Sequence, residues 1–155
     1  MANPRTQSVT NTSDLPGFIL ERTAKRMKQF FQEKLVETKA DITVDQWVVL
    51  QLLDQRKAMS QLDIAKATFK DAPTVTRILD LLCKKNLTVR IPAPDDRRRF
   101  QVELTDAGRL KIKAVMPTIL SARQQAWEGL DPHQMDHLMH TLNTLFSNIS
   151  QPNDF

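Results

Sequence analysis

The sequence predicts a mainly α-helical fold of the α+β class, with six helices and a single β-hairpin. Apolar residues recur at helical spacing through most of the chain, and N-capping residues precede several of these stretches. Only two short runs, LTVRI (87–91) and FQVEL (100–104), are rich in strand-forming residues. A chain of 155 residues with 41% hydrophobic residues has the size and composition of one domain with a buried core.

The first part of the chain predicts a tail and two helices. Residues 1–13 are polar and aperiodic, which is typical of a disordered tail. From Phe18 to about Thr38, apolar residues follow helical spacing. Thr43 with Gln46 three residues later has the pattern of a capping box, and it opens the apolar helix WVVLQLL.

A short helix and a tight turn are predicted next. Ser60 with Asp63 has the pattern of a second capping box, in front of QLDIAKAT (61–68). Phe69 and Lys70 then form a brief turn.

The segment 71–86 predicts the most regular helix of the chain. Asp71 is expected to cap it, and Pro73 lies in the first turn, where its missing N–H costs no hydrogen bond. Asn86 is expected to end it in the left-handed conformation, which asparagine tolerates. The predicted buried stripe is Val75, Ile78, Leu79 and Leu82. The opposite face carries Pro73, Arg77, Asp80 and Lys84, flanked by Thr74 and Thr76.

The C-terminal half predicts the hairpin and two long helices. The two strand-forming runs are close enough to pair, with PAPDDRRR (92–99) as the tip. Thr105 begins a helix to about Glu128, and Pro117 inside it predicts a bend or a local break. Asp131 begins the last helix. Its apolar stripe is Met135, Leu138, Met139, Leu142, Leu145, Phe146 and Ile149. Because one small chain cannot easily cover both terminal helices, we expect a homodimer that packs them together.

The helix, turn and helix over 61–86 predict binding in the major groove of double-stranded DNA. A net charge of +4 and a pI near 9.4 favour a polyanionic partner. Arginine reads guanine through O6 and N7, so Arg77 is a candidate for base contact; Asp80 is expected either to orient Arg77 or to accept a hydrogen bond from a cytosine N4. Lys84 and Lys85 are expected at phosphates. The candidate DNA-contacting residues in the two helices are Ser60, Pro73, Thr74, Thr76, Arg77 and Lys84.

The hairpin concentrates positive charge beside this helix. Arg90 and the three arginines 97–99 outnumber Asp95 and Asp96. A β-loop in this place can reach a minor groove, whose negative potential favours an inserted arginine. An aspartate two residues before an arginine can hold the guanidinium through charge-assisted hydrogen bonds. A solvated charged turn is the alternative interpretation.

The stretch DRRRFQVELTDAG (96–108) resembles the wing signature of the MarR family of winged helix-turn-helix regulators, D-x-R-x-x-x-V-x-L-T-x-x-G. The matching residues are Asp96, Arg98, Val102, Leu104, Thr105 and Gly108. Residues 72–90 resemble that family's recognition helix and first wing strand, and the resemblance extends over about 18–150. Asn86 departs from the glycine often found in the family, and the turn at Phe69 and Lys70 also lacks glycine.

The resemblance implies a winged helix-turn-helix with a two-stranded wing over 41–104, between helical dimerisation regions at 14–40 and 105–150. It also implies an obligate homodimer, usually a repressor, on a pseudo-palindromic operator. A small aromatic or phenolic effector is expected between the dimerisation helices and the winged module.

For the loop, the resemblance implies that Arg98 enters the minor groove and that Asp96 positions it. Arg97 and Arg99 are then expected at phosphates.

Several other observations limit the class of protein. The single cysteine, Cys83, allows no intrachain disulfide and favours a reducing compartment. We see no signal peptide and no apolar run of the roughly 18 residues that a membrane span needs, so a cytoplasmic protein without a membrane partner is expected. The sequence contains no phosphate loop, nucleophile elbow or metal-ligand cluster, which predicts neither an enzyme nor a cofactor.

Some alternatives stay open. Cys83 is a possible redox sensor, although a structural cysteine is favoured. His133, His137 and His140 share one side of the last helix and suggest a zinc-responsive regulator, although a solvated face is favoured. A winged helix used only for protein interaction is the alternative of another class. Trp47 and the phenylalanines are expected in the core.

Overall fold

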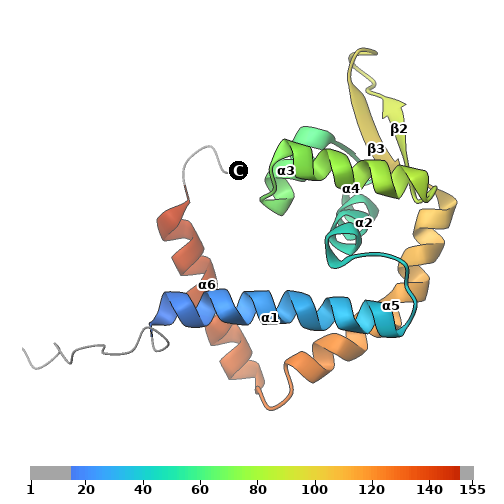
Figure 1. Ribbon diagram of the computed structural model, residues 1–155. Coiled ribbons are helices and arrows are strands. Elements are labelled where there is room, and N and C mark those ends of the chain that lie inside the picture. The colour runs from blue at the N-terminus through green and yellow to red at the C-terminus, as the bar shows by residue number, and fades with distance from the viewer. Residues whose placement is uncertain (1–14, 151–155) are drawn as a thin grey trace, which may run out of the picture.

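The computed structural model describes residues 15–150, so the predicted tail at 1–13 lies outside the described residues. The fold is mainly helical with one small sheet, as predicted (Figure 1). Its elements are α1 (Pro16–Glu37), α2 (Val44–Arg56), β1 (Ala58–Ser60), α3 (Gln61–Thr68), α4 (Ala72–Lys84), β2 (Thr88–Pro92), β3 (Phe100–Leu104), α5 (Asp106–Ala126) and α6 (Pro132–Ile149).

One of the two predicted capping boxes is confirmed and the other is wrong. The Thr43 hydroxyl accepts the Gln46 N–H at 3.2 Å, and the Gln46 side chain accepts the Thr43 N–H at 3.2 Å. Ser60 accepts the Asp63 N–H at 3.1 Å, but its hydroxyl donates to the Asp63 carboxylate at 2.6 Å. The aspartate is one methylene shorter than the glutamate of a capping box, so it binds the hydroxyl and not the backbone N–H of Ser60.

The sheet has three strands, whereas the sequence predicted a two-stranded hairpin. The strand order is β1-β3-β2, and both pairings are antiparallel. Val102 on the central strand lies opposite Met59 of β1 and Arg90 of β2. Strand β1 has only three residues, too few to display the alternation by which a strand is recognised in a sequence.

The core lies where α2, α3, α4 and α5 meet the sheet. The predicted stripe of α4 is confirmed, since Val75, Ile78, Leu79 and Leu82 are all buried. Trp47 is buried as expected, with 4% of its surface exposed. The prediction that the phenylalanines lie in the core is wrong for Phe18, Phe69, Phe100 and Phe146, which are exposed.

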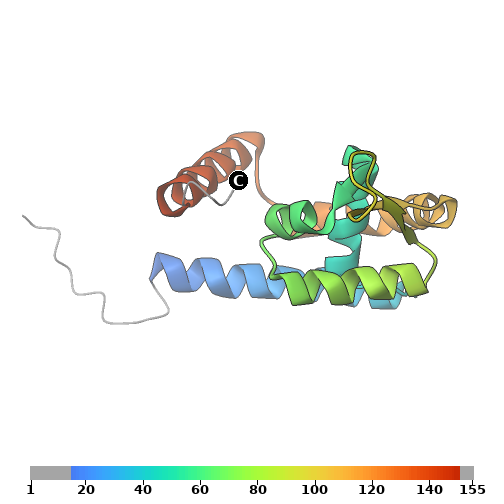
Figure 2. The same cartoon turned by 90° about the horizontal axis from the view of Figure 1, so that it is seen from above.

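Few residues of helices α1 and α6 are buried within the chain. In α1 only Leu35 is buried, and no residue of α6, all of which the structure describes, is buried. Figure 2 shows both helices extending in the same direction away from α2, α3 and α4. Helix α5 connects the two parts; it runs unbroken through Pro117, and its axis changes direction in Figure 1, as expected for a bend. We call α1 and α6 together the arm.

Candidate nucleic-acid interface

Asp71 begins α4 as predicted, and its cap uses the hydroxyl of Thr74. The Asp71 carboxylate accepts the Thr74 N–H at 2.8 Å and the Thr74 hydroxyl at 2.9 Å. These two hydrogen bonds lower the pKa of Asp71 below its ordinary value. The hydroxyl of Thr74 therefore has only its acceptor capacity and the threonine methyl left for a DNA base.

Thr76 lies between the two helices of the helix-turn-helix. Its hydroxyl donates to the carbonyl of Ala72 at 2.9 Å and accepts a hydrogen bond from the Gln61 side chain. Gln61 belongs to α3, so this bond joins α3 to α4. Gln61 was not predicted, because nothing in the local sequence pattern indicates which residue of α3 faces Thr76. Ser60 is similarly engaged, since its hydroxyl holds Asp63 at the start of α3.

The remaining candidates on α4 are exposed. Pro73, Arg77 and Lys84 are all at the surface. Among the described residues, neither Arg77 nor Lys84 forms a hydrogen bond or an ion pair through its side chain. Both cations are therefore available to a ligand without the loss of an internal contact.

Two charged residues of α4 and its C-terminus differ from the prediction. Asp80 was expected to orient Arg77, but its carboxylate binds Arg90 of β2 at 2.6 Å. Lys85 was expected at a phosphate, but its ammonium group binds the backbone carbonyl and the carboxylate of Asp41. Arg90 lies 10 residues from Asp80, and Asp41 lies 44 residues from Lys85, so only the tertiary fold brings these partners together.

The loop between β2 and β3 shows a third difference. Asp96 was expected to hold the guanidinium of Arg98, but its carboxylate accepts the backbone N–H of Arg98 at 2.9 Å. The Asp96 carbonyl accepts the N–H of Arg99 at 2.9 Å, and Ala93 donates to the Arg99 carbonyl at 2.8 Å. Aspartate often binds the backbone two residues ahead, so Asp96 shapes the turn and leaves the guanidinium groups in solvent. Arg97, Arg98 and Arg99 are all exposed.

Thr105 and Gly108 fix the base of this loop against the end of α4. Thr105 caps α5 by accepting the Gly108 N–H at 3.0 Å, and its hydroxyl donates to the Asn86 carbonyl at 2.6 Å. Its N–H donates to the Leu87 carbonyl at 3.1 Å. Asn86 adopts a φ of 56°, the left-handed conformation predicted for it. These bonds hold β2, β3 and α4 in one fixed arrangement.

The exposed cations of α4 and of the loop lie at the same end of the molecule. Figure 1 shows the hairpin of β2 and β3 rising beside α4, on the side of the molecule away from α1. A helix-turn-helix presents its second helix to the major groove, and an adjoining β-loop can contact the neighbouring backbone or minor groove. This fold and its basic surface define a winged helix-turn-helix DNA-binding protein.

The comparison with known proteins agrees with this class. Residues 42–100 match the model of the MarR family. The HTH-type transcriptional repressor IacR of Pseudomonas putida is 27% identical over 88% of this chain and 80% of its own length. BpsR of Bordetella bronchiseptica, whose DNA binding is regulated by 6-hydroxynicotinic acid, is 27% identical with a TM-score of 0.82, over 93% of this chain and 100% of that one. The repressor CouR, bound to a 23-mer DNA duplex, is 28% identical with a TM-score of 0.80, over 89% of this chain and 96% of that one.

The chain resembles the MarR family, whose model matches its central region, and it is a DNA-binding transcriptional regulator. The resemblance in the wing sequence is thereby confirmed.

The residues considered for sensing have simple surroundings. The sulfur of Cys83 is half-buried and lies 3.3 Å from the Thr88 hydroxyl, a contact that joins α4 to β2. His133, His137 and His140 are exposed on α6. Within residues 15–150, no group of three or more His, Cys, Asp or Glu side chains is arranged to hold a metal ion. In the same residues, no helix has both the length and the hydropathy to cross a membrane.

Proposed function

We propose that this protein is a homodimeric repressor that binds a pseudo-palindromic operator and is released by a small aromatic acid. In this proposal α4 enters the major groove and Arg98 enters the adjacent minor groove. Pro73, Thr74 and Arg77 contact bases, while Lys84, Arg97 and Arg99 contact phosphates. The hydroxyls of Ser60 and Thr76 already hold α3 and α4, so we assign these two residues to positioning.

The observation that carries DNA recognition is the set of unpaired cations at one end of the fold. Arg77 and Lys84 on α4 and the three arginines 97–99 have no hydrogen-bond or ion-pair partner through their side chains among the described residues. Elsewhere several basic side chains are paired, as Arg26 is with Glu33 and Lys25 with Glu21. Cations that stay unpaired and close together are the expected property of a surface that neutralises phosphates.

The homodimer is supported by the uncovered apolar surface of the arm. Large hydrophobic residues are 39–78% exposed along both helices; they are Phe18, Ile19, Leu20, Met139, Leu145 and Ile149. A second copy of the chain would bury them, because a twofold contact pairs the same patch with itself. Analytical ultracentrifugation at micromolar concentration is expected to give a dimer. A monomer would contradict this part of the proposal.

The effector proposal rests on a cavity of about 230 Å³ among α1, α2 and α5. Phe31, Trp47 and Trp127 line it with aromatic surface, and Gln51 and Arg123 supply polar groups. The guanidinium group of Arg123 has no hydrogen-bond or ion-pair partner among the described residues. Aromatic walls with one unpaired guanidinium suit a flat aromatic ring that carries a carboxylate. The regulation of BpsR by 6-hydroxynicotinic acid supports the same class of ligand.

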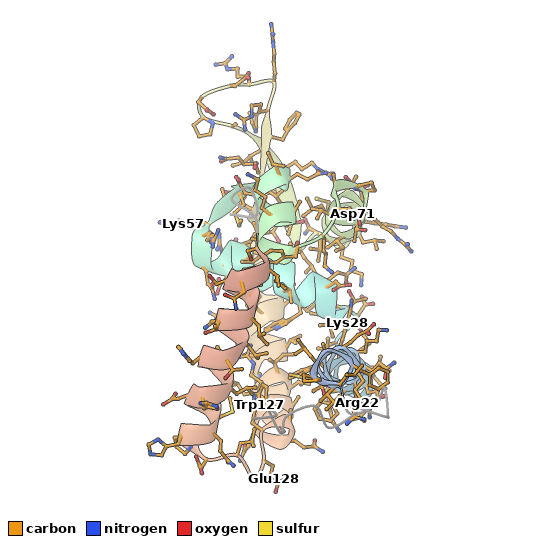
Figure 3. The ribbon with its side chains drawn as sticks, turned by 90° about the vertical axis from the view of Figure 1, so that its left-hand side faces the viewer. Arg22, Lys28, Lys57, Asp71, Trp127 and Glu128 are labelled. Carbon is orange, nitrogen blue, oxygen red and sulfur yellow. The ribbon has the colours of Figure 1, made fainter. Side chains whose placement is uncertain are left out.

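Salt dependence tests the DNA contacts. After operator fragments are selected from random DNA, log K should fall steeply with log salt, and Arg98→Ala should flatten that slope by about one unit. Arg22→Ala is the matched control, since Arg22 lies on α1, far from the loop (Figure 3), and should leave the slope unchanged. An unchanged slope in Arg98→Ala would refute the assignment of Arg98 to the minor groove.

Ligand release tests the cavity. Benzoate, salicylate and 6-hydroxynicotinate serve as probes, and their amides serve as uncharged controls. We expect at least one acid, but not its amide, to weaken operator binding, and we expect Arg123→Ala to abolish that response. Lys113→Ala, which removes an exposed cation from the same helix, should retain it. An effect of the acids that survives in Arg123→Ala would contradict the cavity assignment.

A further inference from the structure

The turn between α3 and α4 contacts the arm through an aromatic pair. The ring of Phe69 lies against the ring of Phe146 on α6, with centroids 5.2 Å apart and planes at 81°. Edge-to-face geometry of this kind is favourable for aromatic rings. Figure 3 shows α6 rising along the molecule to the level of the helix-turn-helix. The last helix of the arm thereby reaches the turn that orients the recognition helix.

The next residue of the turn contacts the other helix of the arm. The Lys70 ammonium group binds the Asp45 carboxylate at 3.0 Å, and the second oxygen of Asp45 binds Lys28 of α1 at 2.9 Å. Asp45 lies at the start of α2, and it links the turn between α3 and α4 to α1. Figure 3 shows Lys28 and Asp71, which follows Lys70, on the same side of the molecule.

The backbone of the turn supports a role beyond simple connection. Phe69 has a φ of 52°, a left-handed conformation that is unfavourable for a bulky side chain and that glycine adopts freely. Such conformations persist where the surrounding contacts determine them. A glycine would make the same turn more easily, but it would remove the ring that contacts α6.

We propose that Phe69 and Asp45 form a two-point clamp, which positions the helix-turn-helix relative to the arm and so sets the spacing between operator half-sites. The clamp rests on the proposed homodimer, in which the arm joins the two DNA-binding units. Successive base pairs are about 3.4 Å apart, so small movements of α4 against the arm change which spacing fits both grooves. Neither clamp residue is among the proposed DNA contacts.

The test compares the wild-type chain with the double variant Asp45→Asn, Phe69→Gly. Glycine suits the φ of position 69, and asparagine has nearly the same shape as the Asp45 side chain that it replaces, so the fold should be retained. The matched control is Glu21→Gln with Leu110→Ala, which removes an exposed ion pair of α1 and an exposed apolar side chain of α5.

The first measurement needs no DNA. Spin labels on Asp95→Cys in a Cys83→Ser background report the distance between the two wings of a dimer. We expect a narrow distribution in the wild type and the control, and a clearly broader one in the double variant. An equally narrow distribution in the double variant would overturn the clamp, whereas the absence of any paired distance in the wild type would overturn the dimer.

The second measurement uses operator duplexes whose half-sites are moved apart by one base pair. The wild type and the control should lose about tenfold in affinity for the longer duplex, and the double variant should lose about threefold or less. Equal losses in all three proteins would overturn the clamp. If the wild type bound none of the selected duplexes, the failure would instead lie in the operator proposal, and the spin-label distances would still decide the clamp.

Discussion

Replacing Gly108 with alanine would place a methyl group where the backbone of another segment already lies. An ideal Cβ at this position is 2.1 Å from the Leu87 carbonyl oxygen, 3.1 Å from its carbon and 3.2 Å from a Leu104 methyl. Because the nearest atom is backbone, the start of α5 must move away from the segment after α4. That movement would break the bonds from Thr105 to the carbonyls of Asn86 and Leu87.

The magnitude follows from three contributions. Overpacking costs about 1–3 kcal/mol. Each of the two Thr105 hydrogen bonds contributes about 0.5–1.5 kcal/mol. Alanine in place of glycine within a helix returns about 1 kcal/mol. We therefore expect Gly108→Ala to lower the free energy of unfolding by roughly 1–5 kcal/mol.

Urea unfolding, followed by circular dichroism at one fixed protein concentration, measures this change. Gly17→Ala is the matched control, since it is also helical but has no heavy atom within 4 Å of the added methyl group. It should be neutral or stabilising by up to about 1 kcal/mol. A Gly108→Ala protein as stable as Gly17→Ala would refute the predicted clash with the Leu87 backbone. A folded Gly108→Ala protein should also bind DNA more weakly, because the wing would be displaced relative to α4.

Three further predictions concern other parts of the molecule. Arg77→Ala should relax base preference in selected operators by about 1–3 kcal/mol at one position per half-site, and an unchanged selection would remove Arg77 from the base-reading set. Burial opposes the ionisation of Asp45, but hydrogen bonds from Lys28 and Lys70 outweigh it and lower its pKa. Its stabilisation is therefore complete above the ordinary pKa of an aspartate and is lost as the pH falls through the lower folded value. Asp45→Asn should reduce stability at neutral pH and should make stability fall less steeply in acid. Thermal melts of the variant and the wild type from pH 7 to pH 2 measure this, and a parallel pH dependence of the two melting temperatures would argue against the prediction. Gly129→Ala should lower the free energy of unfolding by about 1 kcal/mol or more, because Gly129 has a φ of 83°, which is strained for alanine. An unchanged free energy of unfolding in urea titrations would contradict this prediction.

The bonds around the recognition helix explain how the regulator keeps its DNA-binding surface in one shape before it meets DNA. Thr74 and Thr76 hold the start of α4, and the pair of Asp80 with Arg90 joins its middle to the wing. Asp96 fixes the turn at the tip. Because these groups are already ordered, binding should cost less conformational entropy than it would with a mobile loop.

The sequence by itself determined the features that depend on neighbouring residues. The caps at Thr43 and Asp71, the left-handed Asn86 and the buried stripe of α4 all follow from local spacing and backbone preference. The wing signature added the resemblance to the MarR family. For the same reason, the order of the helices and the hairpin was correct without knowledge of the tertiary structure.

Only the tertiary structure decided which side chains are engaged and which remain free. Asp80 pairs with Arg90, and Lys85 pairs with Asp41, so neither serves the role that its position on a helix suggested. Strand β1 pairs with β3, whose partners lie more than 40 residues further along the chain. The spacing of residues along a helix predicts the direction in which a side chain points. It does not predict which group the side chain will bind, because that group belongs to a segment distant in the sequence. The tertiary fold therefore determines which cations are paired, and so which cations remain unpaired and available to DNA.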